Sequence, residues 1–191
     1  NFIMNNTFFG LSNPDNRCAS NSAFQALYAT YLGKDISKFN EKSAINSFIE
    51  NIARKSNFEA LQSIQNMLNF LDVKYMLYID RNELTRNNIK DKKILYKIVS
   101  NNAKILHDFE LDGFFFELTS AIYFKKTGGH YISLVKLPNN NAIICNDMSI
   151  KSPKIENPTL NFYSFPYELI ESGNEFICVG CIYQKINDNP I

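Results

Sequence analysis

The sequence predicts an α+β fold in which an N-terminal helical part packs on a C-terminal antiparallel sheet. Apolar residues recur at three-and-four spacing through the first half of the chain. After Asp112 they gather instead in short aromatic and β-branched runs separated by Gly, Pro and Asn. Helices followed by strands favour this class over alternating βαβ units, which would give a parallel sheet.

Four segments carry the helical pattern. Residues 18–32 place aromatic and aliphatic side chains on one face and end at Gly33, a residue favoured after a helix C-terminus. Residues 41–55 follow, and then a helix after Ser56 with an apolar stripe of Leu61, Ile64, Leu68 and Leu71. The segment from Asp91 to about Leu106 is predicted as the fourth helix, because its apolar residues repeat at the same spacing.

The second half of the chain predicts five strands bounded by turn residues. They are Gly113–Leu118, Ala121–Phe124, His130–Leu137, Ala142–Asn146 and Phe176–Ile186. No internal repeat and no linker is visible, so residues 1–191 are expected to form a single domain. Because the first residue is not Met, we expect this domain to be excised from a longer protein.

Composition excludes several classes of protein. A hydrophobic fraction of 45% with 16 Phe and 10 Tyr in 191 residues is enough for a packed core. The net charge of +1 gives no electrostatic indication of a nucleic acid or an anionic membrane as partner. No run approaches the roughly 18 consecutive apolar residues of a membrane span. Four cysteines in a chain of this length do not make a disulfide scaffold, and a free thiol suits a cytosolic location.

Three positions fit the chemistry of a thiol nucleophile. Cys18 opens the first helix, where the helix dipole and unpaired N–H groups favour the thiolate. His130 begins a strand and would act as general base, and Asn146-Asp147 end the next strand and would orient its imidazole. Cysteine first, histidine much later and carboxylate last is the order of a papain-like protease.

The residues around these positions resemble the motifs of ubiquitin-specific proteases. Residues 10–25 keep the Gly, the Leu, both flanking Asn, the Cys, the Asn-Ser and the Gln of the family's cysteine motif, G-L-x-N-x-G-N-T-C-x-x-N-S-x-x-Q. Residues 120–135 are similar to the histidine motif, whose core is Gly-His-Tyr followed by a strand. Residues 145–150 look like the element that supplies the third catalytic residue. The resemblance implies a papain-like fold.

The resemblance also implies a role for each catalytic position. Cys18 would be the nucleophile, and His130 the general base and then the general acid. Asp147 would orient the imidazole, with Asn146 as the competing candidate. Asn13 matches the side chain that, with the backbone N–H of Cys18, donates to the oxyanion.

The implied partner is ubiquitin or a ubiquitin-like modifier and its conjugates. Gly128, Gly129 and Tyr131 would border the channel that admits the modifier's Gly-Gly end. No cysteine lies between Cys18 and His130, so the zinc-ribbon fingers of many family members are absent and neither metal nor cofactor is expected. One departure is Asp15, which stands where the family has glycine.

Two other features compete for a functional interpretation. Cys178 and Cys181 form a CxxC motif, but residues three apart on a strand should point to opposite faces, so we expect structural cysteines and no zinc. His107 lies beside Asp108, and we expect it to cap a helix or to lie on the surface.

The leading hypothesis is a deubiquitinating cysteine protease that hydrolyses the bond after the C-terminal glycine of the modifier. The alternatives are another papain-like peptidase or a transglutaminase-like enzyme, and a ubiquitin-binding pseudoprotease. Residues 35–110 match no family motif and are expected to hold the modifier's globular body, with one or two apolar side chains exposed among Phe39, Phe58, Met67 and Phe70. The sequence does not identify the source, so the location stays unknown; the cytosol, or the host cytosol for a secreted effector, would suit the free thiol.

Overall fold

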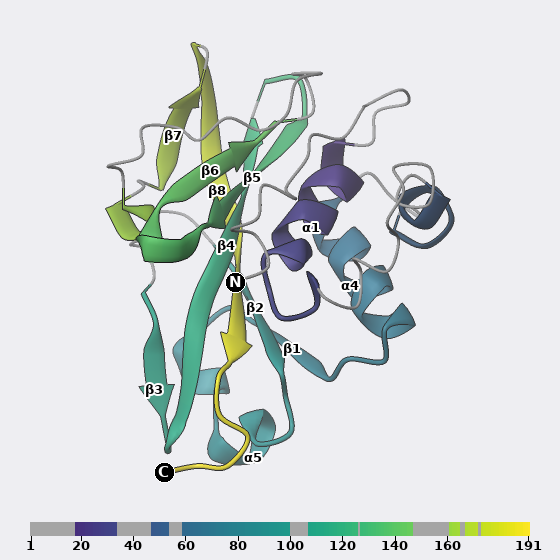
Figure 1. Ribbon diagram of the computed structural model, residues 1–191. Coiled ribbons are helices and arrows are strands. Elements are labelled where there is room, and N and C mark those ends of the chain that lie inside the picture. The colour runs from purple at the N-terminus through teal and green to yellow at the C-terminus, as the bar shows by residue number, and fades with distance from the viewer. Residues whose placement is uncertain are drawn as a thin grey trace.

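The computed structural model is an α+β fold in which two helices cover one face of a twisted sheet (Figure 1). It describes residues 18–33, 47–53, 59–99, 107–125, 127–146, 161–164, 167–171 and 173–191. The predicted fold class is therefore confirmed. None of the helices in these ranges is long and apolar enough to cross a membrane.

Eight strands form one mixed sheet with the order β1-β2-β8-β4-β5-β6, while β3 pairs with β4 and β7 pairs with β8. The strands are β1 Tyr75–Tyr78, β2 Ile94–Ile98, β3 Phe109–Leu111, β4 Phe114–Lys125, β5 His130–Lys136, β6 Ala142–Cys145, β7 Glu168–Glu171 and β8 Asn174–Lys185. The pairing of β1 with β2 is parallel and every other pairing is antiparallel. Strand β8 lies inside the sheet, between β4 on one side and β2 and β7 on the other.

The helical layer consists of two main helices. These are α1 Cys18–Tyr28 and α4 Ala60–Phe70. The π-helical turn η2 Ile49–Ala53 lies between them in the sequence, and the short α5 Arg86–Ile89 follows later. Three further turns are 3₁₀ helices: η3 Arg81–Glu83, η4 Pro138–Asn140 and η5 Phe162–Ser164. All 11 residues of α1 are buried, because the helix lies between α4 and the sheet.

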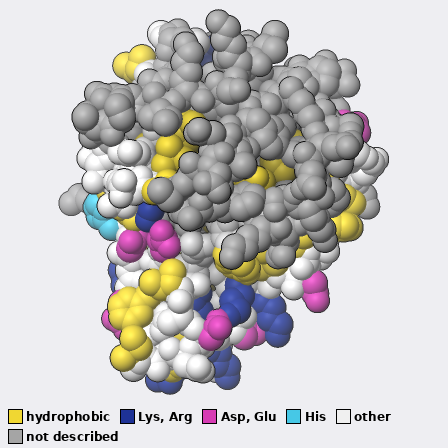
Figure 2. Space-filling model, viewed as in Figure 1, with side chains coloured by type: hydrophobic (Ala, Val, Ile, Leu, Met, Phe, Trp, Pro, Cys, Tyr) yellow, Lys and Arg dark blue, Asp and Glu magenta, His cyan; other side chains and the backbone are white. Residues whose placement is uncertain are grey.

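Both faces of the sheet are buried. On the helical side, Phe24 and Leu27 of α1 and Ile64 of α4 pack on sheet residues such as Ile122 and Ile182. The opposite face forms a second core, which contains Phe116, Leu118, Tyr123, Leu169, Phe176 and Tyr183. At the end of the molecule where α5 and the C-terminus lie, basic and acidic side chains are interspersed on the surface (Figure 2).

The helix predicted from Asp91 to Leu106 is wrong, because residues 94–98 form strand β2. Ile94, Leu95 and Tyr96 are at most 2% exposed, since the strand is covered on both faces. In a strand that is covered on both faces, apolar and polar residues do not alternate. The spacing of the apolar residues alone therefore could not distinguish this strand from a helix. The β-branched and aromatic residues of the run were the signal that favoured a strand.

Other predicted elements differ in extent. Gly113–Leu118 and Ala121–Phe124 merge into the single strand β4, with a bulge between Leu118 and Ser120. Strands β1, β3 and β7 were not predicted. Of the helix expected over 41–55, residues 41–46 and 54–55 lie outside the described ranges, and the rest contains the π-helical turn η2.

Candidate active site

Cys18 is the first residue of α1, and its side chain lies against the start of β5. Its Sγ atom lies 4.0 Å from the carbonyl oxygen of Gly129, so the thiol makes a long, weak hydrogen bond there. The residue is 8% exposed. A cysteine at this position lies where the unpaired N–H groups of the first helical turn favour a thiolate.

The contact depends on the turn between β4 and β5. Gly128 and Gly129 have φ angles of +96° and +67°, in the left-handed region that glycine adopts at no steric cost. A Cβ atom on Gly129 would meet only Phe124, at 4.0 Å, so backbone conformation and not space requires glycine at this position. The turn therefore presents the Gly129 carbonyl to Cys18 and starts β5 at His130.

His130 and Asn146 are brought together by the antiparallel pairing of β5 with β6. His130 Nε2 lies 2.8 Å from Asn146 Oδ1. Because an amide oxygen only accepts, Nε2 carries the hydrogen and the lone pair of the neutral ring is on Nδ1. The ring also contacts Phe176 of β8 edge-on, with 6.2 Å between centroids. The hydrogen bond and the aromatic contact both help to fix the orientation of the imidazole.

Two predicted site residues, Asn13 and Asp147, lie outside the described residues. The described part of the site therefore contains two contacts, that of Cys18 with Gly129 and that of His130 with Asn146. They are linked because Gly129 and His130 are consecutive in the chain. Of the two candidates for the orienting residue, Asn146 is the one whose contact with the imidazole the structure describes.

Tyr131 lies near both Cys18 and the start of α4. Its ring packs on Phe124 with 4.6 Å between centroids. Its hydroxyl accepts a hydrogen bond from the backbone N–H of Ala60. Burial raises the pKa of the Tyr131 hydroxyl, and the negative charges that Glu59 and Cys18 can carry raise it further. The side chain therefore fills the space beside Cys18 as a neutral group.

Several supporting residues carry no signal in the sequence. The hydroxyls of Ser20 and Ser63 lie 3.1 Å apart in the core and connect α1 to α4. Phe176 supports His130 from a strand that is distant in sequence.

His107, the other histidine of the chain, is exposed and contacts the ring of Tyr163. The expected surface position is confirmed, whereas the expected helix cap is not tested, because residues 100–106 lie outside the described ranges.

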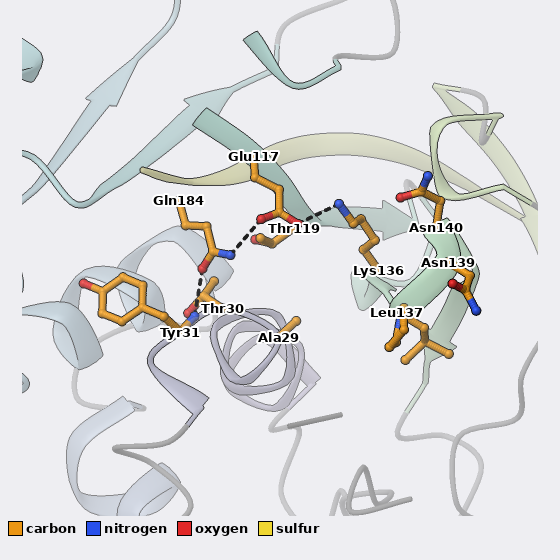
Figure 3. A pocket seen from close by; sticks show the side chains of 11 residues that line it. Ala29, Thr30, Tyr31, Glu117, Thr119, Lys136, Leu137, Asn139, Asn140 and Gln184 are labelled. Carbon is orange, nitrogen blue, oxygen red and sulfur yellow. Dashed lines mark hydrogen bonds and ion pairs between the residues drawn. The ribbon is translucent and has the colours of Figure 1, made fainter. Parts of the chain in front are cut away.

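A pocket of about 440 Å³ lies at the other end of α1 (Figure 3). Ala29, Thr30 and Tyr31 line one side of it, and the opposite side includes Glu117 and Lys136, which form an ion pair at 2.7 Å. Of the candidate catalytic residues that the structure describes, none lines this pocket. In the described part of the chain, no three His, Cys, Asp or Glu side chains are grouped so that they could hold a metal ion.

No family model and no curated protein matches this sequence. The fold does match solved structures of the SAGA Ubp8/Sgf11/Sus1/Sgf73 DUB module. One structure of the module, with a variant Ubp8, has a TM-score of 0.56 at 11% identity, covering 95% of this chain and 68% of the other. Another, of the yeast module with mutant Sgf73, has a TM-score of 0.53 at 12% identity, covering 95% and 69%. The chain therefore has the fold of a deubiquitinase domain of the ubiquitin-specific protease type, a papain-like fold.

Proposed function

We propose that this chain is a deubiquitinating cysteine protease that hydrolyses the peptide or isopeptide bond after the C-terminal glycine of ubiquitin or a ubiquitin-like modifier. The observation that carries the proposal is the site itself. A thiol at a helix N-terminus lies against the residue that precedes a histidine, and an amide oxygen at 2.8 Å holds that histidine by Nε2. The deubiquitinase-type fold, and the motifs around Cys18 and His130, support the same reaction.

In the proposed reaction, Nδ1 of His130 takes the proton of Cys18, and the thiolate attacks the carbonyl carbon of the modifier's last glycine. The oxyanion accepts hydrogen bonds from the Cys18 backbone N–H and the Asn13 amide. His130 then returns its proton to the leaving amine, which leaves a thioester on Cys18. Water, deprotonated by the same imidazole, hydrolyses the thioester. Asn146, with Asp147 as the alternative, keeps Nε2 protonated and the ring in place.

The residues around Gly129 would select the modifier's end. A Cβ atom at Gly128 would meet no atom within 4 Å, so the turn itself leaves its outer side open to a peptide. Tyr131 also lies near Cys18, and its hydroxyl accepts a hydrogen bond from the backbone N–H of Ala60 in α4. A chain that ends in two residues without side chains fits between a backbone turn and an aromatic ring, whereas a bulkier end would displace one of them.

The test is the reaction of Cys18 with ubiquitin that carries a C-terminal electrophile. We expect one covalent adduct, absent in Cys18→Ala and strongly slowed in His130→Ala. The matched control is iodoacetamide, which needs a reactive thiol but no modifier surface. Labelling by iodoacetamide alone would indicate another papain-like enzyme, and binding of ubiquitin without any adduct would indicate a pseudoprotease. Either result would overturn the proposal.

The same electrophile on SUMO and on NEDD8 would identify the modifier. The segment proposed to hold its body is the helical region that includes α4. Of the four apolar side chains predicted there, Met67 is buried and Phe70 is 55% exposed at the end of α4. Phe39 and Phe58 lie outside the described residues. We propose Phe70, which packs edge-on against Phe48, as an anchor of this surface.

A further inference from the structure

The cysteines of the CxxC motif on β8 lie on the same face of the sheet, so the expected opposite orientation is wrong. Ile122 of β4 pairs with Gly180, whereas the next residue, Tyr123, pairs with Cys178. Val179 is therefore an extra residue that has no partner in β4, which defines a β-bulge. Because of this extra residue, Cys178 and Cys181 point to the same face of the sheet, although side chains three apart on a regular strand point to opposite faces. Their two Sγ atoms therefore lie 3.8 Å apart.

Gly180 makes this arrangement possible. A Cβ atom at this position would lie 1.8 Å from the hydroxyl oxygen of Tyr96 and 2.2 Å from its ring. Tyr96 is itself 2% exposed and lies on β2, the strand that pairs with β8 there. The Tyr96 hydroxyl thus occupies the space that any other side chain at residue 180 would need. Tyr96 therefore packs against the backbone of the bulge on the face of the sheet that the helices cover. Both thiols point to the other face, into the core that contains Tyr123 and Tyr183.

The two thiols share an enclosed site. Cys178 is 7% and Cys181 is 5% exposed, and both belong to the core that contains Tyr123 and Tyr183. Cys178 Sγ also lies 3.6 Å from the Gly180 carbonyl oxygen. The hydrogen bond that the Cys181 thiol donates to Cys178 Sγ and the burial of the thiol both raise the pKa of Cys181. A bulky adduct on either sulfur has no room in this site, whereas the second sulfur is already in contact.

We propose that Cys178 and Cys181 are an oxidation site that forms a reversible intramolecular disulfide when the protein meets a small peroxide. One thiol attacks the peroxide O–O bond, becomes a sulfenic acid and releases one molecule of water. The sulfur of the other thiol then attacks this sulfenic sulfur, and the S–OH oxygen leaves as a second molecule of water. Both S–H hydrogens are lost, one S–S bond forms, and two electrons pass to the peroxide.

Proximity decides which product forms. The sulfurs must approach from 3.8 Å to the roughly 2 Å of a disulfide, a movement within reach of rotation about the side-chain bonds. A reacting group already in contact has a high effective concentration, so the second thiol traps the sulfenic acid before a second peroxide reaches it. The inference is independent of Cys18 and of the proposed activity.

The experiment uses the Cys18→Ser chain, in which the candidate nucleophile cannot itself be oxidised. The folded protein is treated with hydrogen peroxide, unfolded, alkylated and digested. We expect a loss of two hydrogen masses in the peptide that spans Cys178 and Cys181, protection of both thiols from alkylation, and full reversal by dithiothreitol. Removing Cys145, which is also buried, by Cys145→Ser should change none of this. Cys178→Ser should abolish the disulfide and leave an over-oxidised Cys181.

Three results would overturn the proposal: sulfinic acid on either cysteine of the intact pair, a disulfide to another molecule, or closure only after the chain is unfolded. Peptide mapping of the unaltered pair decides among them even if Cys178→Ser fails to fold. Circular dichroism of the oxidised sample shows whether the bridge formed in the native protein.

Discussion

Replacing Asn146 by Ala removes the hydrogen bond between Asn146 Oδ1 and His130 Nε2, whereas the Phe176 contact of the imidazole is kept. During the proposed reaction the ring becomes a cation, and a hydrogen bond to a charged group contributes about 1.5–3 kcal/mol. Since about 1.4 kcal/mol of barrier is a factor of ten in rate, kcat should fall about ten- to 150-fold. KM should change little, because Asn146 holds the histidine and not the modifier.

The assay is steady-state release of a fluorophore from the C-terminus of ubiquitin, with Asn189→Ala, at an exposed position after β8, as matched control. Thermal unfolding of both variants checks that the fold is intact. The reasoning would be refuted if Asn146→Ala kept full kcat, or if Asp147→Ala lowered kcat further than Asn146→Ala does. The second outcome would assign the orienting role to Asp147.

Three further predictions use the same assay. His130→Ala should abolish turnover with the fold intact, whereas His107→Ala, at an exposed position, should leave it nearly unchanged; the opposite result would contradict the assigned base. Phe70→Glu should raise KM by about 30-fold, the equivalent of a 2 kcal/mol anchor, with kcat nearly constant. Ile79→Glu, at an exposed residue outside α4, is its control, and an equal effect of both would show a general charge effect. A chelator should change neither activity nor unfolding temperature, and unfolding by a chelator would disprove the expected absence of metal.

The parts of the fold that the sequence predicts well are those with a strong local signal. Helix α1 has a clear apolar pattern, and β5 begins directly after two glycines whose positive φ angles end the preceding strand. The candidate site could be predicted because its described residues stand at the ends of these elements. Cys18 begins a helix, His130 begins a strand, and Asn146 follows one.

What the sequence did not predict depends on contacts between distant segments. Residues 94–98 form a strand because β8 pairs with them and because both faces of the strand are covered. The spacing of apolar residues within this segment indicates neither the pairing nor the covering. The contact of Phe176 with His130 requires β8, β4 and β5 to lie side by side. The bulge at Val179 follows from the pairing of β8 with β4, and its only local trace is the glycine that follows.

The position of β8 inside the sheet determines when the molecule can be completed during synthesis. It is the last of the described strands to be made, at residues 174–185, yet it joins β2 and β7 to β4. At about 5–20 residues per second, roughly ten to thirty seconds separate the appearance of Cys18 from that of β8. Throughout that time the apolar surface of α1 lacks its finished sheet and is open to chaperones. The helix that begins with Cys18 is therefore made well before Phe176, the β8 residue that contacts His130, so the candidate site is complete only after β8 has been synthesised.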